Sequence, residues 1–367
     1  MENQTISFSR KQTCEIFLGS DILPQVVGRV SRMGLAKKCV VLTNDIVGKW
    51  YLEPLLAELR GRGFSSFSLT VPDGEEAKTL ETAASIYPQL LEAGIDRHCP
   101  LFALGGGVIT DLGGFIAATW MRGIPFIPIP TTLLAMVDAS VGGKTAVNLP
   151  MGKNLVGAFH QPVAVGIDVT LLRTLPLTQL SYGLVEAIKH GAIADSAYFK
   201  FIQKSRSEIK SKEPGLIHRL VRRSINIKKV FVEEDELDTG RRAFLNFGHT
   251  FGHAFEVLGA YRRLHHGEAV GLGMIQALLA ARRLGILRED YSESLAELLV
   301  DFNLPIRVPL EWTADDIANV MLRDKKRKNE KINLILPTAL GAVSSVPISA
   351  SELPGLLTDI LQSQKRS

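Results

Sequence analysis

The chain has 367 residues, of which 46% are hydrophobic and 22% are charged. This length exceeds what a single hydrophobic core usually fills and indicates two domains, and the composition excludes an intrinsically disordered chain. The net charge of +4 is too small for a nucleic-acid-binding protein, although local clusters of cations could still hold small anions. We therefore expect a soluble globular protein.

The cysteines and the N-terminus give an expectation about the cellular compartment. Cys14, Cys39 and Cys99 are far apart, which argues against a disulfide framework or a cysteine metal site. The first residues lack the basic leader and apolar segment of a secretory signal. The stretch 101–121 has the apolar character of a membrane span, but it contains Asp111 and several glycines, which disfavour that reading. We expect a cytoplasmic protein without a membrane partner.

Short apolar runs alternate with helical patterns in the first half of the chain. The predicted strands are residues 39–42, 67–71, 101–104, 126–129 and 163–169. Residues 78–93 lie between the second and third of these strands and have the spacing of an amphipathic helix. A strand, a helix and another strand in succession predict a parallel sheet, so the fold class is α/β.

The second half has a different pattern. Long amphipathic segments follow one another at 184–194, 214–232, 248–258, 267–284 and 292–302. Residues 332–336 form one late strand-like run. We therefore expect a mainly α-helical second domain, with the boundary near residue 175.

A glycine-rich turn lies between the predicted strand at 101–104 and a predicted helix at 108–120. All three residues at 105–107 are glycine. Glycines let the backbone approach a pyrophosphate closely, and the N–H groups of a helix N-terminus attract it, so this turn is typical of dinucleotide-binding sites. However, Thr110 replaces the third glycine of the G-x-G-x-x-G pattern, and a tight structural corner explains the turn about equally well.

Polar residues also follow the first two predicted strands. Asn44 comes after the first strand, and Asp73, Glu75 and Lys78 come after the second. Acidic groups at a strand tip suit the hydroxyls of a cofactor ribose, whereas helix capping explains the same residues without any ligand. Both interpretations remain open from the residues alone.

Histidines gather in one region of the second half. Half of the chain's eight histidines lie between positions 249 and 266, and His249 and His253 are one helical turn apart. Solvated or core histidines are the simpler explanation, but clustering favours a metal site. Glu186 is a charge inside an apolar helical stretch, which makes it the candidate carboxylate ligand. Two histidines and one glutamate would leave coordination positions open for substrate or water.

Several cations complete the set of candidate residues. They are Lys144, Lys153, Lys189, Lys228, Arg242 and the run at 324–328. A charge run is usually a solvated surface, but Lys144 follows a turn of small residues through which it could reach an anion. Together these residues predict a nicotinamide cofactor between two domains, a divalent metal and a cationic pocket for an acidic substrate. Such a site could oxidise an alcohol.

These residues occur in motifs that resemble the 3-dehydroquinate synthase family of sugar-phosphate cyclases. The matching motifs, in chain order, are Gly-Gly-Gly-Val at 105–108 with Asp111, Met-Arg-Gly at 121–123, Pro-Thr-Thr-Leu-Leu-Ala-Met-Val-Asp at 130–138, Gly-Gly-Lys-Thr at 142–145, Gly-Lys-Asn at 152–154, Glu-Ala-Ile-Lys at 186–189, Asn-Phe-Gly-His-Thr-Phe-Gly-His at 246–253, His-Gly-Glu-Ala-Val at 266–270 and Asp-Lys-Lys at 324–326. They span most of residues 40–345, so as a set they are specific.

The resemblance implies a Rossmann-like NAD-binding domain over 1–175 and a helical metal- and substrate-binding domain over 176–367. It implies zinc, with cobalt as an alternative, on Glu186, His249 and His266. The implied catalytic residues are Asp138, Lys144, Asn154, Lys189, Lys228, Arg242, Asn246, His253 and Lys326. The implied cofactor-binding residues are Asn44, Asp73, Glu75, Lys78, Gly105, Gly106, Gly107, Val108, Asp111, Thr131, Thr132, Asp138, Lys144 and Lys153. It also implies a homodimer in which Arg122 reaches the neighbouring subunit's site.

The implied reaction converts 3-deoxy-D-arabino-heptulosonate 7-phosphate to 3-dehydroquinate and phosphate, a step of the shikimate pathway and of aromatic amino acid biosynthesis. It proceeds by transient oxidation with NAD, phosphate elimination, reduction and intramolecular aldol closure. The alternatives are a sister cyclase acting on another sugar phosphate, a metal-dependent polyol dehydrogenase that releases NADH, and a nucleotide-sensing module without catalysis. Lys228, Arg242 and Asn246 favour the heptulosonate, because its carboxylate needs additional fixed cations and no opposing acid.

Overall fold

The computed structural model describes residues 12–323 and 331–366, and these divide into two compact units. Unit 1 contains the described residues up to Pro130 together with Gly142–Asp168. Unit 2 contains Thr131–Val141 together with the described residues from Val169 onward.

This division differs from the predicted boundary at residue 175, because 131–141 and 169–175 belong to unit 2. The first of these segments contains the π-helix η3 (Ala135–Ala139), which packs against helices α5 (Leu177–Ala194) and α8 (Pro214–Glu234). A segment that packs on unit 2 helices belongs to unit 2, although it follows a strand of unit 1 directly in the chain. The roles assigned to the two domains stay predictions.

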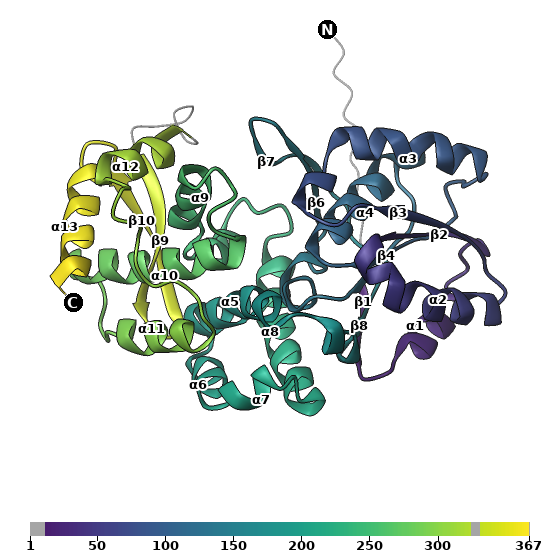
Figure 1. The fold of residues 1–367 in the computed structure, drawn as a ribbon, viewed down its shortest axis with the longest axis horizontal. Helices are drawn as coiled ribbons and strands as arrows, with labels where there is room; N and C mark the ends of the chain where they lie inside the picture. The colour runs from purple at the N-terminus through teal and green to yellow at the C-terminus, as the bar shows by residue number, and fades with distance from the viewer. Residues whose placement is uncertain (1–11, 324–330, 367) are drawn as a thin grey trace, which may run out of the picture. The chain divides into compact units, whose positions relative to one another are not determined.

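A parallel sheet forms the centre of unit 1. Its strands, in the order β3-β2-β4-β5, are β3 (Ser65–Val71), β2 (Lys38–Asn44), β4 (Leu101–Gly105) and β5 (Phe126–Pro130). The crossover connections that parallel strands require are the helices α2 (Asp45–Gly61), α3 (Leu80–Glu92) and α4 (Gly107–Thr119) (Figure 1). A separate parallel pair joins β1 (Glu15–Gly19) to β8 (Ala164–Asp168). The predicted α/β class and parallel sheet are confirmed.

The central strand β4 is buried along its whole length because both faces of the sheet are covered. Leu101 and Ala103 face the core that α3 and α4 complete. Phe102 lies between them in sequence and therefore points to the other face, where its ring meets that of Phe64 edge-to-face at 6.4 Å between centroids. This is why residues 101–104 form a continuous apolar run rather than an alternating one.

An antiparallel hairpin, which the sequence pattern did not predict, follows in unit 1. It consists of β6 (Lys144–Leu149) and β7 (Gly152–Phe159). A Cβ at Gly157 would lie 2.1 Å from the Thr145 carbonyl oxygen, and one at Gly114 of α4 would lie 2.3 Å from the Thr145 methyl group. Small residues thus let the hairpin pack closely on itself and on α4.

Unit 2 is mainly helical, as predicted. Its helices besides α5 and α8 are α6 (Ser196–Lys204), α7 (Arg206–Lys210), α9 (His249–Leu258), α10 (His266–Arg283), α11 (Ser292–Asp301), α12 (Ala314–Arg323) and α13 (Leu353–Arg366). The predicted strand at 332–336 is part of β9 (Lys331–Ala339), which pairs antiparallel with β10 (Ala342–Ser349). Figure 1 shows this hairpin in yellow among the green and yellow helices.

Three helices of unit 2 approach one another unusually closely at glycines. A Cβ at Gly273 of α10 would lie 2.0 Å from the Gly248 carbonyl oxygen at the start of α9, and one at Gly267 would lie 2.5 Å from the Tyr182 backbone on α5. Gly248 itself has φ +80°, a left-handed conformation that glycine adopts without a Cβ penalty. These contacts bring the N-terminal ends of α9 and α10 next to the middle of α5.

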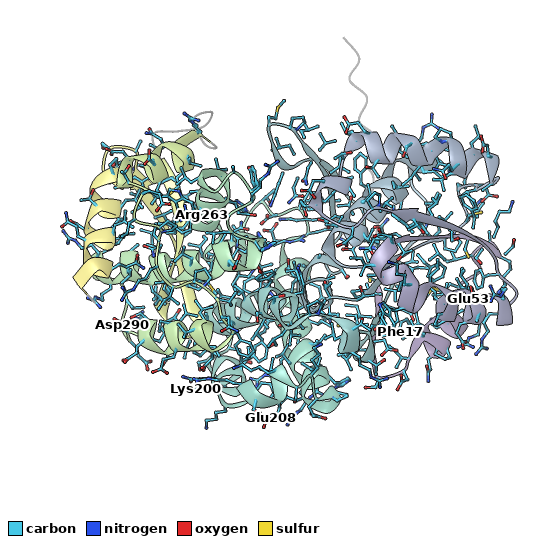
Figure 2. The ribbon with its side chains drawn as sticks, in the orientation of Figure 1. Phe17, Glu53, Lys200, Glu208, Arg263 and Asp290 are labelled. Carbon is cyan, nitrogen blue, oxygen red and sulfur yellow. The ribbon has the colours of Figure 1, made fainter. Side chains whose placement is uncertain are left out.

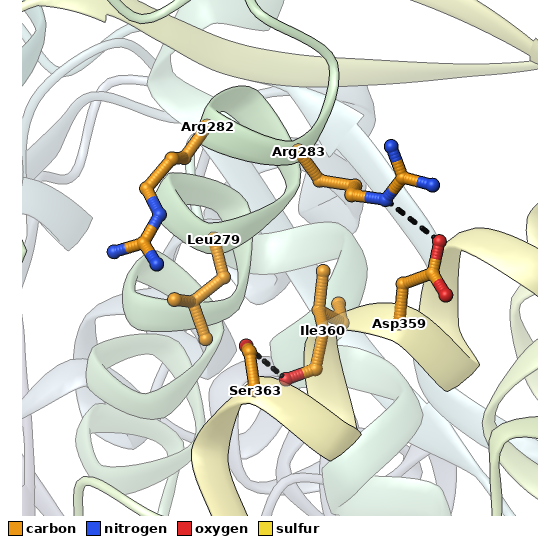
Figure 3. A pocket seen from close by; sticks show the side chains of 6 residues that line it. All are labelled: Leu279, Arg282, Arg283, Asp359, Ile360 and Ser363. Atoms are coloured by element: carbon orange, nitrogen blue, oxygen red, sulfur yellow. Dashed lines mark hydrogen bonds and ion pairs between the residues drawn. The ribbon is translucent and has the colours of Figure 1, made fainter. Parts of the chain in front are cut away.

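The outside of the chain carries many charged side chains, among them the exposed Glu53 of α2, Lys200 of α6 and Glu208 of α7 (Figure 2). A small hollow of about 270 Å³ lies between α10 and α13 (Figure 3). Its lining residues are Leu279, Arg282, Arg283, Asp359, Ile360 and Ser363, none of which is a predicted site residue. Among the helices that the structure describes, none is both long enough and apolar enough to cross a membrane.

Candidate active site

Three side chains of unit 2 converge as a metal site requires. Glu186 comes from the middle of α5, whereas His249 and His266 are the first residues of α9 and α10. The Glu186 Oε1 atom lies 3.6 Å from His249 Nε2 and 3.8 Å from His266 Nε2, and one ligand atom of each residue lies within 4.8 Å of the others. The close helix packing described above therefore gathers the predicted ligand set.

The chemistry of this group fits a cation. The Glu186 side chain is 1% exposed, and its two carboxylate oxygens have no hydrogen-bond partner among the described residues. The Lys189 ammonium, one turn along α5, forms an ion pair with Glu186 Oε2, although the contact lacks hydrogen-bond geometry. Because a buried carboxylate without hydrogen bonds is costly, Oε1 is suited to a metal ion between the two imidazoles.

Hydrogen bonds orient both imidazoles. His249 Nδ1 lies 3.3 Å from the Phe247 carbonyl oxygen, and His266 Nδ1 lies 3.4 Å from Glu256 Oε2. Burial, together with the neighbouring Lys189 ammonium, holds the pKa of His249 well below its usual value. Its ring is therefore neutral at pH 7, with the proton on Nδ1 and the lone pair on Nε2, which is the form that binds metals.

His253 lies beside this group but is not part of it. Its ring centroid is 5.7 Å from that of His249 and 6.4 Å from that of His266, and the three-ligand group contains His249 and His266 instead. His253 shares a helix face with His249, as predicted, whereas the second imidazole ligand position is reached from the next helix.

A partly buried ion pair lies next to the three-ligand group. Lys228 of α8 donates to the Asp138 backbone carbonyl at 2.6 Å and also bonds Asp138 Oδ1. The Asp138 and Lys228 side chains are 29% and 7% exposed. Burial by itself would raise the pKa of Asp138, but the Lys228 and Lys189 ammonium groups outweigh it and hold that pKa well below its usual value.

His190, which lies close to Asp138 and Glu186, starts a buried hydrogen-bond chain. Tyr198 donates its single hydroxyl proton to the Leu220 carbonyl oxygen at 2.7 Å. Ser224 Oγ lies 2.9 Å from the Tyr198 hydroxyl oxygen, so Ser224 must be the donor there. His190 Nδ1, 3.1 Å from Ser224 Oγ, must then donate to it. Burial and the adjacent Lys189 lower the pKa of His190 to about 3, so the ring is neutral and Nε2 carries a lone pair.

Arg242 and Asn246 belong to the short helix η5 (Arg241–Asn246) before α9. The Arg242 side chain donates to the Glu236 carbonyl oxygen at 2.5 Å, and burial lowers its pKa. Asn246 is exposed. Lys326, the remaining predicted substrate residue, lies outside the residues that the structure describes.

The predicted cofactor residues of unit 1 form a second polar group. Lys78, 3% exposed, donates to Asp111 Oδ2 and to Asn154 Oδ1, both at 2.6 Å. Asn148 holds this group together, because its amide donates to Glu75 Oε1 at 2.7 Å and accepts the Asn154 backbone N–H at 2.9 Å. Burial alone would lower the pKa of Lys78, but Asp111 and Glu75 outweigh burial and raise it, so the ammonium is charged.

The strand tips and the glycine turn lie at the carboxyl ends of the parallel strands. Asn44 caps α2 by accepting the Val47 N–H at 2.8 Å, and its amide also donates to Asp73. The capping interpretation is therefore correct for Asn44, and the residue contacts a second strand tip as well.

Gly105 provides a tight corner in that turn, since a Cβ there would lie 2.6 Å from the Ile109 Cβ. Gly106 is the N-cap of α4 and has no side chain with which to cap the N–H groups of the first turn. Gly106, Gly107 and Val108 are only half-buried. The structure thus combines a structural corner with an accessible helix N-terminus.

The other predicted cofactor residues lie in both units. Lys144 begins β6 and Lys153 lies in β7, both in unit 1. Thr131 and Thr132 are in unit 2, where Thr131 is buried and the Thr132 hydroxyl accepts the Ala135 N–H at 3.2 Å.

Comparisons with known proteins decide the family. The 3-dehydroquinate synthase N-terminal domain family matches residues 68–182, and the 3-dehydroquinate synthase C-terminal domain family matches residues 183–327. The chain belongs to the 3-dehydroquinate synthase family. A 3-dehydroquinate synthase of Syntrophotalea carbinolica is 42% identical over 326 residues, which cover 89% of this chain and 90% of that protein. That of Thermodesulfovibrio yellowstonii is 39% identical over 350 residues, which cover 95% and 98%.

A solved structure outside the 3-dehydroquinate synthases has a similar fold over nearly the whole chain. The 2-epi-5-epi-valiolone synthase of Streptomyces hygroscopicus subsp. jinggangensis 5008, with NAD+ and Zn2+ bound, has a TM-score of 0.88 and 26% identity, covering 98% of this chain and 100% of that one.

Four residues of these groups were not anticipated from the sequence: Asn148, His190, Ser224 and Glu256. Glu256 carries a signal that could have found it, because it is an acid on the predicted helix that bears His249 and His253. Asn148, His190 and Ser224 carry no such signal, since their roles depend on contacts with distant segments.

Proposed function

We propose that this chain is a 3-dehydroquinate synthase that converts 3-deoxy-D-arabino-heptulosonate 7-phosphate to 3-dehydroquinate and phosphate. The observation that carries the proposal is the group in unit 2, where three metal-ligand side chains lie next to the Asp138–Lys228 ion pair and Lys189. The family membership of the whole chain supports the same reaction. The enzyme would be a carbon–oxygen lyase of aromatic amino acid biosynthesis.

We propose Glu186, His249 and His266 as the ligands of one divalent ion, zinc or cobalt. Two nitrogens and one oxygen suit zinc and leave an open position for a substrate hydroxyl. The unsatisfied Glu186 oxygens and the neutral His249 ring support this assignment. Bound zinc would supply a Lewis acid for that hydroxyl, and bound NAD would supply a redox partner that is restored within each turnover.

The polar group of unit 1 and the glycine turn are proposed to hold NAD. The accessible N-terminus of α4 suits the pyrophosphate, and the acidic strand tips suit ribose hydroxyls. The proposed cofactor-binding residues are Asn44, Asp73, Glu75, Lys78, Gly105, Gly106, Gly107, Val108, Asp111, Thr131, Thr132, Asp138, Lys144 and Lys153. Lys78 would act mainly by fixing Asp111 and Asn154, since its hydrogen bonds go to these two residues.

The cations are proposed to bind the anionic substrate. A guanidinium binds a carboxylate through two parallel hydrogen bonds, so Arg242 is the candidate for the carboxylate of the heptulosonate. A metal ion bound to Glu186 would neutralise the Glu186 carboxylate. The Lys189 ammonium, which is paired with Glu186 here, would then be available for a substrate oxygen. The proposed substrate residues are Asp138, Lys144, Asn154, Lys189, Lys228, Arg242, Asn246, His253 and Lys326.

The Asp138–Lys228 pair has a specific advantage for such a substrate. Its carboxylate can accept a hydrogen bond from a hydroxyl, and the attached ammonium cancels the negative charge that would repel a phosphate or carboxylate. Asp138 stays ionised across the physiological range because its pKa is held low. We assign no general base among the protein side chains.

We further propose that the protein works as a cytoplasmic homodimer in which Arg122 reaches the partner's site. Met121 and Arg122 form an exposed turn with positive φ angles of 50° and 64°. Leu155 and Phe159, on the outward face of β7, are 58% and 45% exposed. Large exposed apolar side chains of this kind suit contact with a partner subunit.

Phosphate release from competing substrates tests the proposed activity. A 2-deoxy-scyllo-inosose synthase whose structure contains carbaglucose-6-phosphate, NAD+ and Co2+ has a TM-score of 0.83, so sugar phosphates without a carboxylate are the relevant competitors. We expect release from the heptulosonate to exceed release from sedoheptulose 7-phosphate or glucose 6-phosphate by orders of magnitude, because these would leave Arg242 poorly paired. Equal rates on all three substrates would contradict the proposal.

A further inference from the structure

A buried carboxylate lies behind one of the three proposed metal ligands. Glu256 lies near the C-terminal end of α9 and is 2% exposed. Its Oε2 atom lies 3.4 Å from Nδ1 of His266, on the side of the ring opposite the atom that faces Glu186. Glu256 thus contacts His266 through Nδ1, whereas Nε2 of the same ring faces Glu186.

Helix geometry explains how α9 supplies both a ligand and this carboxylate. Glu256 follows His249 by seven residues, which is close to two helical turns, so both lie on one face of α9. That face packs on α10, whose first residue is His266. Two residues of the short connection between these helices, Ala260 and Tyr261, have positive φ angles of 50° and 57°.

The hydrogen bond decides which nitrogen of His266 can bind a cation. An ionised carboxylate only accepts hydrogen bonds, so His266 Nδ1 must carry the proton in this contact. In the neutral ring the lone pair is then on Nε2, the atom 3.8 Å from Glu186 Oε1. His249 reaches the same state differently, because its Nδ1 faces a backbone carbonyl. The acceptor for the Nδ1 proton is therefore a side-chain carboxylate for His266 and a backbone carbonyl for His249.

We propose that Glu256 is a positioning residue for the metal ion: it holds the His266 ring in the tautomer and orientation that direct Nε2 toward Glu186. The inference rests on the metal site given under the proposed function. Carboxylates in this position raise the basicity of the ligand imidazole, and their loss typically costs 10–100-fold in metal affinity. The negative charge of an ionised Glu256 would also attract a dication bound at this site.

The test measures zinc affinity by competition with a chromophoric chelator, on the full chain stripped of metal. Glu256→Gln keeps an oxygen that can accept the Nδ1 proton but removes the charge, whereas Glu256→Leu removes both. We expect the dissociation constant for zinc to rise roughly tenfold in the first variant and roughly 100-fold in the second. The visible absorption of the Co²⁺-loaded protein should change in the same order.

Two controls separate positioning from a purely structural role. Glu268 lies in the first turn of α10, close in sequence to His266, and its carboxylate accepts the His265 N–H at 2.7 Å. The control variant Glu268→Gln should leave the zinc affinity within about twofold of the wild type. Thermal unfolding in the presence of a chelator reports whether the Glu256 variants are folded without metal. Should Glu256→Leu fail to fold, Glu256→Gln carries the test alone.

The possible outcomes have distinct meanings. Unchanged zinc affinity in Glu256→Gln, or in a folded Glu256→Leu, overturns the positioning role while leaving the metal site intact. A wild-type protein that binds no zinc overturns the metal site itself. A loss of zinc affinity in Glu268→Gln equal to that in Glu256→Gln would show a general effect of acids near His266 and would also overturn the proposal.

Discussion

Removing one partner of the Asp138–Lys228 pair should destabilise unit 2 more than removing both. In Lys228→Met the ammonium is replaced by an apolar side chain of similar length, so Asp138 loses its hydrogen-bonded partner. Lys189 remains close enough to lower the pKa of Asp138, but it acts on Asp138 through charge alone, whereas Lys228 also donates a hydrogen bond. The carboxylate is then poorly compensated.

The size of the effect follows from the burial of the two groups. Breaking a fully buried ion pair by removing one partner costs about 3–5 kcal/mol. The Asp138 side chain is 29% exposed and can recover some hydration, so we expect roughly 2–3 kcal/mol here. For a domain of this size, that lowers the unfolding temperature by roughly 5–10 °C. The double variant Lys228→Met with Asp138→Asn removes both charges. It should recover more than half of the stability that Lys228→Met loses.

The assay is thermal unfolding of metal-free protein, followed by circular dichroism, for the wild type, both single variants and the double variant. The folded pKa of Asp138 is depressed, so the pair contributes above the unfolded value of about 3.9 and its contribution is lost as the pH falls toward the folded value. The difference in unfolding temperature between the wild type and Lys228→Met should therefore be largest at pH 7 and decrease in acid. Two results would refute this reasoning. One is a Lys228→Met variant that unfolds within 1–2 °C of the wild type at pH 7. The other is a double variant that is less stable than either single variant.

Three further predictions concern the ligands. His249→Ala should lose most of the zinc that the purified wild type binds, because one of three protein ligands is gone; full retention, measured by elemental analysis, would refute the ligand assignment. Lys78→Met should weaken NAD binding roughly tenfold in calorimetry through loss of the contacts to Asp111 and Asn154, and unchanged binding would place this group outside the cofactor site. Arg242→Ala should narrow the preference for the heptulosonate over sedoheptulose 7-phosphate, measured as the ratio of kcat/KM values; an unchanged ratio would assign the carboxylate to another cation.

The parallel sheet could be predicted from the sequence because each buried strand leaves a local signal. Residues 101–104 are covered on both faces and therefore read as one apolar run. The hairpin at 144–159 left no such signal, since its strands are half exposed and depend on Gly157 and Gly114 for close packing. The domain boundary likewise depends on the packing of 131–141 against helices of unit 2, which no local pattern expresses.

The metal group could be predicted in outline because its residues are chemically unusual for their surroundings. An acid in an apolar helix pointed to Glu186, and clustering pointed to the histidines. The choice of His266 over His253 came from family motifs rather than from helical spacing, which favoured His253. The partners that orient these groups, such as Glu256 and Ser224, become evident only when neighbouring helices are placed side by side.

The most direct test of the central claim is the redox balance of the reaction. Metal-loaded protein is incubated with 3-deoxy-D-arabino-heptulosonate 7-phosphate and NAD far below the substrate concentration, while phosphate release and the absorbance of NADH are followed together. The account predicts many equivalents of phosphate per NAD, one 3-dehydroquinate for each phosphate, and no accumulation of NADH. NADH formed in proportion to substrate consumed, without phosphate release, would contradict it and indicate a polyol dehydrogenase.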